Sequence, residues 1–156
     1  MLYYMGEFIR FLCMKRRCPM LQQYQKKSLV RRQTILKSIL IVEDDANVGS
    51  YLIEAIRQES PYHSLLVVNS ERALEVVKHI KPDLFLLDYH LSSMNGIELY
   101  DRLHATEGLE AIPAIIMSAS LPQELLDKEI KQRHLPALPS PHELSALLAT
   151  LQKLLT

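Results

Sequence analysis

The alternation of short apolar runs with longer amphipathic stretches, from residue 38 onward, constrains the fold most strongly. Runs that consist almost entirely of Ile, Leu and Val are typical of parallel strands buried on both faces. Strands that alternate with helical stretches predict an α/β protein with a doubly wound (βα)5 parallel sheet. The predicted strands are 39–42, 65–68, 84–87, 114–117 and a weaker 135–138, and the predicted helices are 46–58, 70–80, 96–105, 122–133 and 141–155.

Polar residues follow several of these runs. Glu43, Asp44 and Asp45 follow the first run, Asp88 follows the third, and Ser118 follows the fourth. In open α/β sheets, ligands bind in the crevice at the carboxyl ends of the strands. Carboxylates that meet there would repel one another, and a divalent cation with hard oxygen ligands, Mg²⁺, would relieve the repulsion. The pattern therefore predicts a metal-assisted phosphoryl site.

A simpler reading applies to one of these residues. Asp45 precedes a predicted helix, and an aspartate at that position caps the helix by accepting hydrogen bonds from its free amides. Helix capping alone would explain a single acidic strand end, but it explains two such ends together with Ser118 less well.

Composition and charge exclude several other classes. The chain has 156 residues, no tryptophan and 6% aromatic residues, which disfavours an aromatic surface for single-stranded nucleic acid. No glycine-rich phosphate loop follows a predicted strand, which argues against a Walker site or a dinucleotide fold. The two cysteines, Cys13 and Cys18, are too few for a disulfide framework or a zinc site, so a cytoplasmic location is expected.

Four segments resemble the receiver domain of bacterial two-component response regulators in order and spacing. They are ILIVEDD (39–45), PDLFLLDYHLSSMNGIEL (82–99), IPAIIMSAS (112–120) and LPALPSPHEL (135–144). The resemblance covers about residues 37–155 and implies a CheY-like, flavodoxin-like sheet with strand order 2-1-3-4-5.

The resemblance also implies roles for individual residues. Asp88 would accept a phosphoryl group from a histidine kinase or a histidine phosphotransfer protein. Glu43, Asp44 and Asp88 would hold Mg²⁺, together with the backbone carbonyl of His90. The hydroxyl of Ser118 would contact a phosphoryl oxygen. Activity would be limited to self-phosphotransfer and self-dephosphorylation at Asp88, unlike that of a conventional enzyme.

Three positions depart from the family pattern. Leu138, before Pro139, replaces a lysine that pairs with the phosphoryl group in the family. Leu135 replaces an aromatic switch residue, and Ser92 stands where proline is usual. Metal binding is expected to survive these changes, whereas the usual form of signal output is in question.

Two functions remain open from the sequence. The first is a phosphoacceptor receiver that signals through protein–protein contacts with an unknown downstream target. The second is a degenerate receiver that serves as a phosphorylation-independent interaction module. A dehalogenase-type phosphatase is disfavoured, because its nucleophilic aspartate follows the first strand. No output module follows the last predicted helix, and no nucleic-acid partner is expected.

The chain divides by charge into an extension, 1–37, and a receiver domain, 38–156. The extension has nine basic residues and one acidic residue, whereas the domain has nine basic and seventeen acidic residues. Apolar residues at helical spacing in 5–12, followed by basic residues, are compatible with a weak anchor on an anionic membrane or a basic arm for an acidic partner. The same segment can also be an extension upstream of a start at Met20, and we favour a flexible, dispensable extension over membrane contact.

Overall fold

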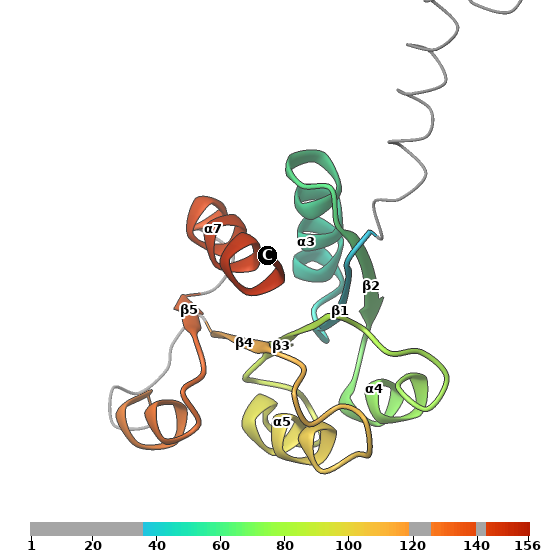
Figure 1. Cartoon of the computed structure of the whole chain (residues 1–156), viewed down its shortest axis with the longest axis vertical. Coiled ribbons are helices and arrows are strands. Elements are labelled where there is room, and N and C mark those ends of the chain that lie inside the picture. The colour runs from blue at the N-terminus through green and yellow to red at the C-terminus, as the bar shows by residue number, and fades with distance from the viewer. Residues whose placement is uncertain (1–35, 119–125, 140–142) are drawn as a thin grey trace, which may run out of the picture. The chain divides into compact units, whose positions relative to one another are not determined.

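Five parallel strands form one sheet with the order β2-β1-β3-β4-β5 (Figure 1). The computed structural model describes residues 36–118, 126–139 and 143–156. The order and the α/β class confirm the prediction from sequence. The strands are β1 (Ser38–Val42), β2 (His63–Val67), β3 (Leu84–Asp88), β4 (Ala114–Ser118) and β5 (Ala137–Pro139).

Helical elements connect the strands and cover both faces of the sheet. Helices α3 and α7 lie on one side, and α4 and α5 lie on the other (Figure 1). The helical elements are α3 (Ala46–Glu59), α4 (Ser70–Val76), α5 (Gly96–His104), the π-helical turn η1 (Leu126–Ile130) and α7 (Leu144–Leu155).

Alternate residues of the central strands supply two separate apolar cores. In β1, Leu40 and Val42 pack on the α4 and α5 side, whereas Ile39 and Ile41 pack on the α3 and α7 side. Residues at period two point to opposite faces of a strand, so a strand buried on both faces must be apolar throughout. This requirement explains why β1, β3 and β4 were recognisable as continuous apolar runs.

The two edge strands differ most from the predicted ranges. Strand β2 begins at His63, which pairs with Ser38, and both His63 and Leu65 are exposed. Helices cover an edge strand less completely than a central one, so an edge strand can contain polar residues. The start of such a strand is therefore not recognisable as an apolar run. Strand β5 begins later than predicted, because the amide of Leu135 donates to the carbonyl of Ile130 and so belongs to the preceding turn.

Side chains fix the starts of three helices. Asp45 accepts hydrogen bonds from the amides of Asn47 and Val48, so it does cap α3. Asn69 caps α4, as its position before Ser70 suggests. Asn95 and Glu98 form a capping box at the start of α5.

The bounds of α3 and α5 differ from the predicted ranges by one residue each, and two other helices differ by more. Helix α4 ends at Val76 rather than 80, and Val77–His79 continue as a turn. Helix α7 begins at Leu144, and the earlier residues of its predicted range, 141 and 142, lie outside the described residues. The predicted start of the helix 122–133 and nearly all of the extension 1–37 also lie outside them.

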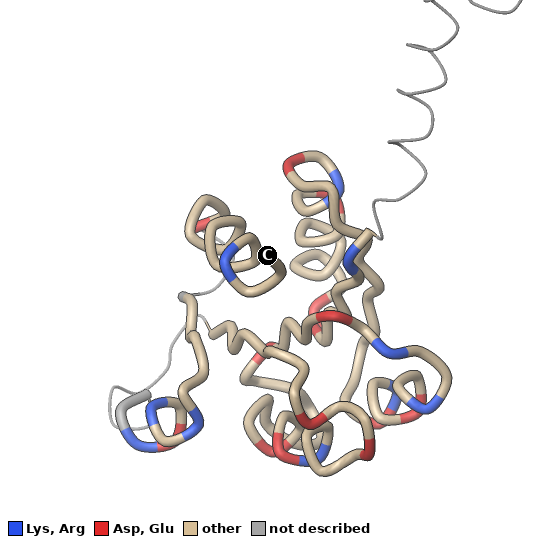
Figure 2. Tube along the Cα trace, viewed as in Figure 1, with Lys and Arg blue, Asp and Glu red and all other residues tan. Residues whose placement is uncertain are grey.

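Charged residues lie on helices and loops rather than within the sheet (Figure 2). Asp88, the last residue of β3, is the one Lys, Arg, Asp or Glu in the five strands. Among the residues that the structure describes, no helix is both long enough and apolar enough to cross a membrane.

The Asp45 cap gives a direct test of how α3 is held. Asp45→Ala should lower the free energy of unfolding by about 1 kcal/mol, because two amides of the first turn lose their acceptor. Asp45→Asn should retain most of that stability, since the amide oxygen can accept the same bonds. Urea denaturation of the three proteins measures the difference, and an alanine variant as stable as the native protein would show that the cap contributes nothing.

Candidate functional site

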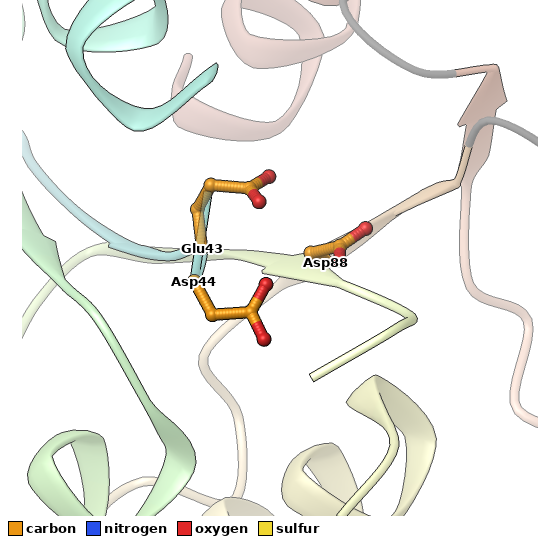
Figure 3. A group of neighbouring side chains, drawn as sticks. All are labelled: Glu43, Asp44 and Asp88. Atoms are coloured by element: carbon orange, nitrogen blue, oxygen red, sulfur yellow. The ribbon is translucent and has the colours of Figure 1, made fainter. Parts of the chain in front are cut away.

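Three carboxylates converge at the carboxyl end of the sheet. Glu43, Asp44 and Asp88 each offer an oxygen, and these oxygens lie within 4.8 Å of one another. Glu43 and Asp44 project to opposite sides of the end of β1, and Asp88 lies beside them on β3 (Figure 3). The sequence predicted this cluster from two separate acidic strand ends.

Backbone pairing sets this arrangement. Val42 of β1 pairs with Leu87 of β3, so the next residues, Glu43 and Asp88, emerge at the same edge. The amide of Glu43 donates to the carbonyl of Val67 at 3.1 Å, which holds the first residue beyond β1 against β2. Pairing within the sheet therefore fixes the positions of Glu43 and Asp88, and Asp44 follows Glu43 directly.

Ser118 reaches the same edge from the other side. It ends β4 and is only 3% exposed. Its neighbour Met117 pairs with Asp88, and the carbonyl of Met117 accepts a hydrogen bond from the amide of Tyr89 at 2.8 Å. Ser118, whose hydroxyl is predicted to contact a phosphoryl oxygen, thus lies at the end of β4, the strand next to the one that carries Asp88.

Burial and crowding raise the pKa of two of the three carboxylates. Burial raises the pKa of Glu43 to about 7, and the negative charges of Asp88, Asp44 and Asp45 add to the rise. A hydrogen bond from the amide of Asp45 opposes it. Burial also raises the pKa of Asp88, while the amide of His90 opposes the rise. The site therefore resists carrying its full negative charge without a cation.

The loop after Asp88 stays close to the carboxylate of this residue. The amide of His90 donates to Oδ2 of Asp88 at 3.1 Å, and the amide of Gly96 donates to the carbonyl of Tyr89 at 3.0 Å. A Cβ on Gly96 would overlap the carbonyl oxygen of Asp88, so only glycine fits this close approach. Sequence reasoning gave Gly96 no role here, although the Asn-Gly pair before a helix is a signal for such a turn.

Two of the three positions that depart from the family pattern are half-buried leucines, and the third, Ser92, is exposed. The Cα of Leu138 pairs with that of Met117, one residue before Ser118, and Leu138 packs on the α3 and α7 side of the sheet. Leu135 packs against the core on the opposite side. Both side chains are thus held by apolar contacts and offer no polar group to the site.

Comparison with known proteins identifies the family of this chain. Residues 39–152 match the family described as response regulator receiver domain. The chain belongs to this family. Its relatives include the DNA-binding response regulator MtrA of Mycobacterium tuberculosis, 34% identical over 86 residues that cover 55% of this chain and 36% of MtrA. The phosphate regulon transcriptional regulatory protein PhoB of Pseudomonas aeruginosa is 39% identical over 83 residues, covering 53% of this chain and 36% of PhoB.

A shorter relative is similar over a larger share of its length. The sporulation initiation phosphotransferase F of Bacillus subtilis is 36% identical over 83 residues, which cover 53% of this receiver chain and 64% of the relative. The receiver chain thus spans about a third of the length of MtrA and PhoB and less than two thirds of this phosphotransferase.

Solved structures confirm the fold. The chemotaxis protein CheY4 of Vibrio cholerae superposes with a TM-score of 0.69 at 18% identity, covering 76% of this receiver chain and 98% of CheY4. A response regulator of Chloroflexus aurantiacus gives a TM-score of 0.70 at 22% identity, covering 77% of this chain and 98% of the other. At this level of identity the likeness establishes the architecture alone.

The pKa of Glu43 predicts an unusual pH dependence of stability. In the metal-free receiver, the folded state holds the Glu43 proton more tightly than the unfolded chain does. Stability should therefore fall as pH rises from about 4.5 to about 7, by on the order of 2–3 kcal/mol. Urea denaturation with a chelator at several pH values measures the slope.

The control for this experiment is Glu43→Gln, which keeps the shape and cannot ionise. This variant should flatten the decline between about pH 4.5 and 7. Identical slopes in the two proteins would contradict the assignment of the raised pKa to Glu43.

Proposed function

We propose that the receiver accepts a phosphoryl group on Asp88 from a histidine kinase or a histidine phosphotransfer protein. Receiver domains interact with donors of this kind. The observation that supports the proposal is the convergence of Glu43, Asp44 and Asp88 at one edge of the sheet, with Asp88 at the end of the central strand β3. That edge is where open α/β sheets bind their ligands.

Mg²⁺ fits the donor set of this edge. Receiver domains typically bind Mg²⁺ at an acidic pocket, and the three carboxylates supply the hard oxygen ligands that this ion prefers. Glu43, Asp44 and Asp88 would hold the ion with the backbone carbonyl of His90. When bound, the ion neutralises charge on the carboxylates and on the phosphoryl oxygens. The raised pKa values of Glu43 and Asp88 support this role, because both reflect a site that disfavours uncompensated negative charge.

Transfer of the phosphoryl group requires mainly that the donor and Asp88 are correctly positioned. One oxygen of Asp88 attacks the phosphorus of a phosphohistidine, a P–O bond forms, and the P–N bond breaks. The donor imidazole keeps the electron pair of that bond and takes up a proton. Phosphoryl transfer of this kind depends mainly on positioning and charge stabilisation. The hydroxyl of Ser118 would donate to a phosphoryl oxygen, and the amide of His90 already points at Oδ2 of Asp88.

The proposal extends to the rest of the chain. MtrA and PhoB bear names that refer to DNA binding and to transcription, but this receiver covers only about a third of either. We assign it an output through protein–protein contacts in the cytoplasm, without a nucleic-acid partner. Chemistry would be limited to self-phosphotransfer and self-dephosphorylation. Residues 1–37 would form an extension to the receiver domain, 38–156.

A second candidate is a receiver that binds partners without being phosphorylated. Two leucines favour this candidate. Leu138 has no charge that could pair with a phosphoryl group, and Leu135 has no aromatic ring that could change position on phosphorylation. The acidic cluster favours the first candidate, since three mutually repelling carboxylates have no structural benefit in a simple binding module. We therefore rank phosphoacceptance first.

Asp88→Asn should abolish phosphorylation. Incubation with Mg²⁺ and a small phosphodonor, followed by intact mass measurement, should show one added phosphoryl group on the native protein and none on the variant. Asp101→Asn, which changes a half-exposed aspartate of α5, is the matched control and should still be modified. Undiminished modification of Asp88→Asn would show that another residue is the acceptor. An unmodified native protein that also fails to bind Mg²⁺ would favour the interaction module.

Leu138→Lys should strengthen the response to a phosphoryl mimic. A charge-assisted hydrogen bond contributes about 1.5–3 kcal/mol, and leucine cannot form one. Affinity for a beryllofluoride-type mimic should therefore rise at least tenfold in the lysine variant. Leu138→Met keeps an uncharged side chain of similar size and should leave the affinity unchanged. Equal affinity of the lysine and methionine variants would mean that position 138 does not reach the phosphoryl group.

A further inference from the structure

Two serine side chains join the loop after Asp88 to the start of α4. The hydroxyl oxygens of Ser70 and Ser93 lie 2.6 Å apart, within hydrogen-bonding distance. Ser70 is the first residue of α4 and is fully buried, whereas Ser93 lies on the exposed outer part of the loop. The bond therefore ties an exposed loop to a buried anchor.

Glu71 extends this connection. Polar interaction with the hydroxyl of Ser93, and to a smaller extent with that of Ser70, lowers the pKa of the Glu71 carboxylate. A serine hydroxyl has one hydrogen to donate and an oxygen that can accept. When Ser93 donates to Glu71, its oxygen remains able to accept from Ser70. The first turn of α4 thus contacts the loop at two consecutive residues.

The junction between β2 and α4 also holds the other side of the acidic cluster. The carbonyl of Val67, the last residue of β2, accepts a hydrogen bond from the amide of Glu43 at 3.1 Å. Ser70 lies only three residues further along the chain. One short segment, 67–70, therefore contacts both the end of β1 and the loop that follows β3.

Other contacts also hold the loop. The hydrogen bond from Gly96 to Tyr89 closes its base, and the buried side chain of Leu91 anchors its first half. Beyond Leu91, the bond between Ser93 and Ser70 is a polar attachment of the outer part of the loop, and the adjacent Met94 packs against the core on the α4 and α5 side. His90 lies between the base and these anchors, and its amide donates to Asp88.

We propose that Ser70 and Ser93 are positioning residues for the acidic site. Their hydrogen bond holds the loop so that the backbone of His90 keeps its place beside Asp88. This inference rests on the proposed function, in which the carbonyl of His90 is a ligand of Mg²⁺. Loss of the bond lets the loop move outward, which weakens both the bond from His90 to Asp88 and the binding of the ion.

The Mg²⁺ affinity of alanine variants tests whether the hydrogen bond between Ser70 and Ser93 positions the site. Ser93→Ala and Ser70→Ala should each lower the affinity measured by calorimetric titration by about threefold to tenfold, the range that one neutral hydrogen bond spans. The double variant should lose no more than either single one, because both changes remove the same bond. Ser93→Thr, which keeps the hydroxyl, should restore affinity close to that of the native protein.

Ser92→Ala is the matched control. Ser92 is the neighbouring exposed serine, and its side chain makes no hydrogen bond within the described ranges. This change should leave Mg²⁺ affinity as it is in the native protein. A loss as large as that of Ser93→Ala would overturn the proposal, because it would show that any change in this loop perturbs the site.

A second measurement is independent of the proposed function. In the metal-free protein, hydrogen exchange of the His90 amide followed by NMR should be faster in Ser93→Ala than in the native protein and unchanged in Ser92→Ala. If the native protein does not bind Mg²⁺, the proposed function is contradicted. Hydrogen exchange of the His90 amide would still test whether the bond between Ser70 and Ser93 holds the loop. Unchanged His90 exchange in Ser93→Ala, or additive losses in the double variant, would overturn the positioning role.

Discussion

The parallel pairing of β1 with β3 controls the rest of the site. The register joins Val42 to Leu87, so the residues that follow them, Glu43 and Asp88, are carboxylates that lie at the same edge of the sheet. A shift by one residue would turn Glu43 or Asp88 toward the opposite face. Apolar burial of four successive residues in each strand fixes the register, which means that the hydrophobic core also sets the geometry of the charges.

The electrostatic cost of this arrangement is visible in the pKa values. Burial and neighbouring carboxylates keep the pKa of Glu43 near 7 and raise that of Asp88. Backbone amides of Asp45 and His90 compensate only in part. A cation at this edge would remove the remaining repulsion, whereas Leu138 offers none of the positive charge that a lysine would bring. These residues therefore support metal binding more strongly than they support a large conformational response to phosphorylation.

The sequence predicted the parts of the protein that depend on local pattern. Ile39–Val42 and Leu84–Leu87 were recognisable as strands because both faces of the central sheet are apolar. The acidic residues that follow them could be grouped because parallel strands end at a shared edge. The half-exposed strand β2 and the early end of α4 were less predictable, since tertiary packing decides how much of such a segment is covered.

Contacts between distant residues could not be predicted. Ser70 and Ser93 are 23 residues apart and carry no motif, so their hydrogen bond follows only from the packing of α4 beside the loop. The need for glycine at position 96 likewise depends on how closely the loop returns to the carbonyl of Asp88. The family resemblance supplied roles for Glu43, Asp44, Asp88, His90 and Ser118. The structure places the three acidic side chains together and puts Ser118 on the adjacent strand, and the roles themselves stay predictions.

The effect of Mg²⁺ on the free energy of unfolding tests the central claim most directly. Any ligand that binds the folded state stabilises it in proportion to the logarithm of its concentration above Kd. Stability measured near pH 7 should rise with the logarithm of Mg²⁺ concentration once that concentration exceeds Kd, and NaCl of equal ionic strength should not reproduce the rise. Asp44→Asn should reduce the response. An identical effect of the two salts, or an undiminished Mg²⁺ response in Asp44→Asn, would contradict a cation site built from these carboxylates.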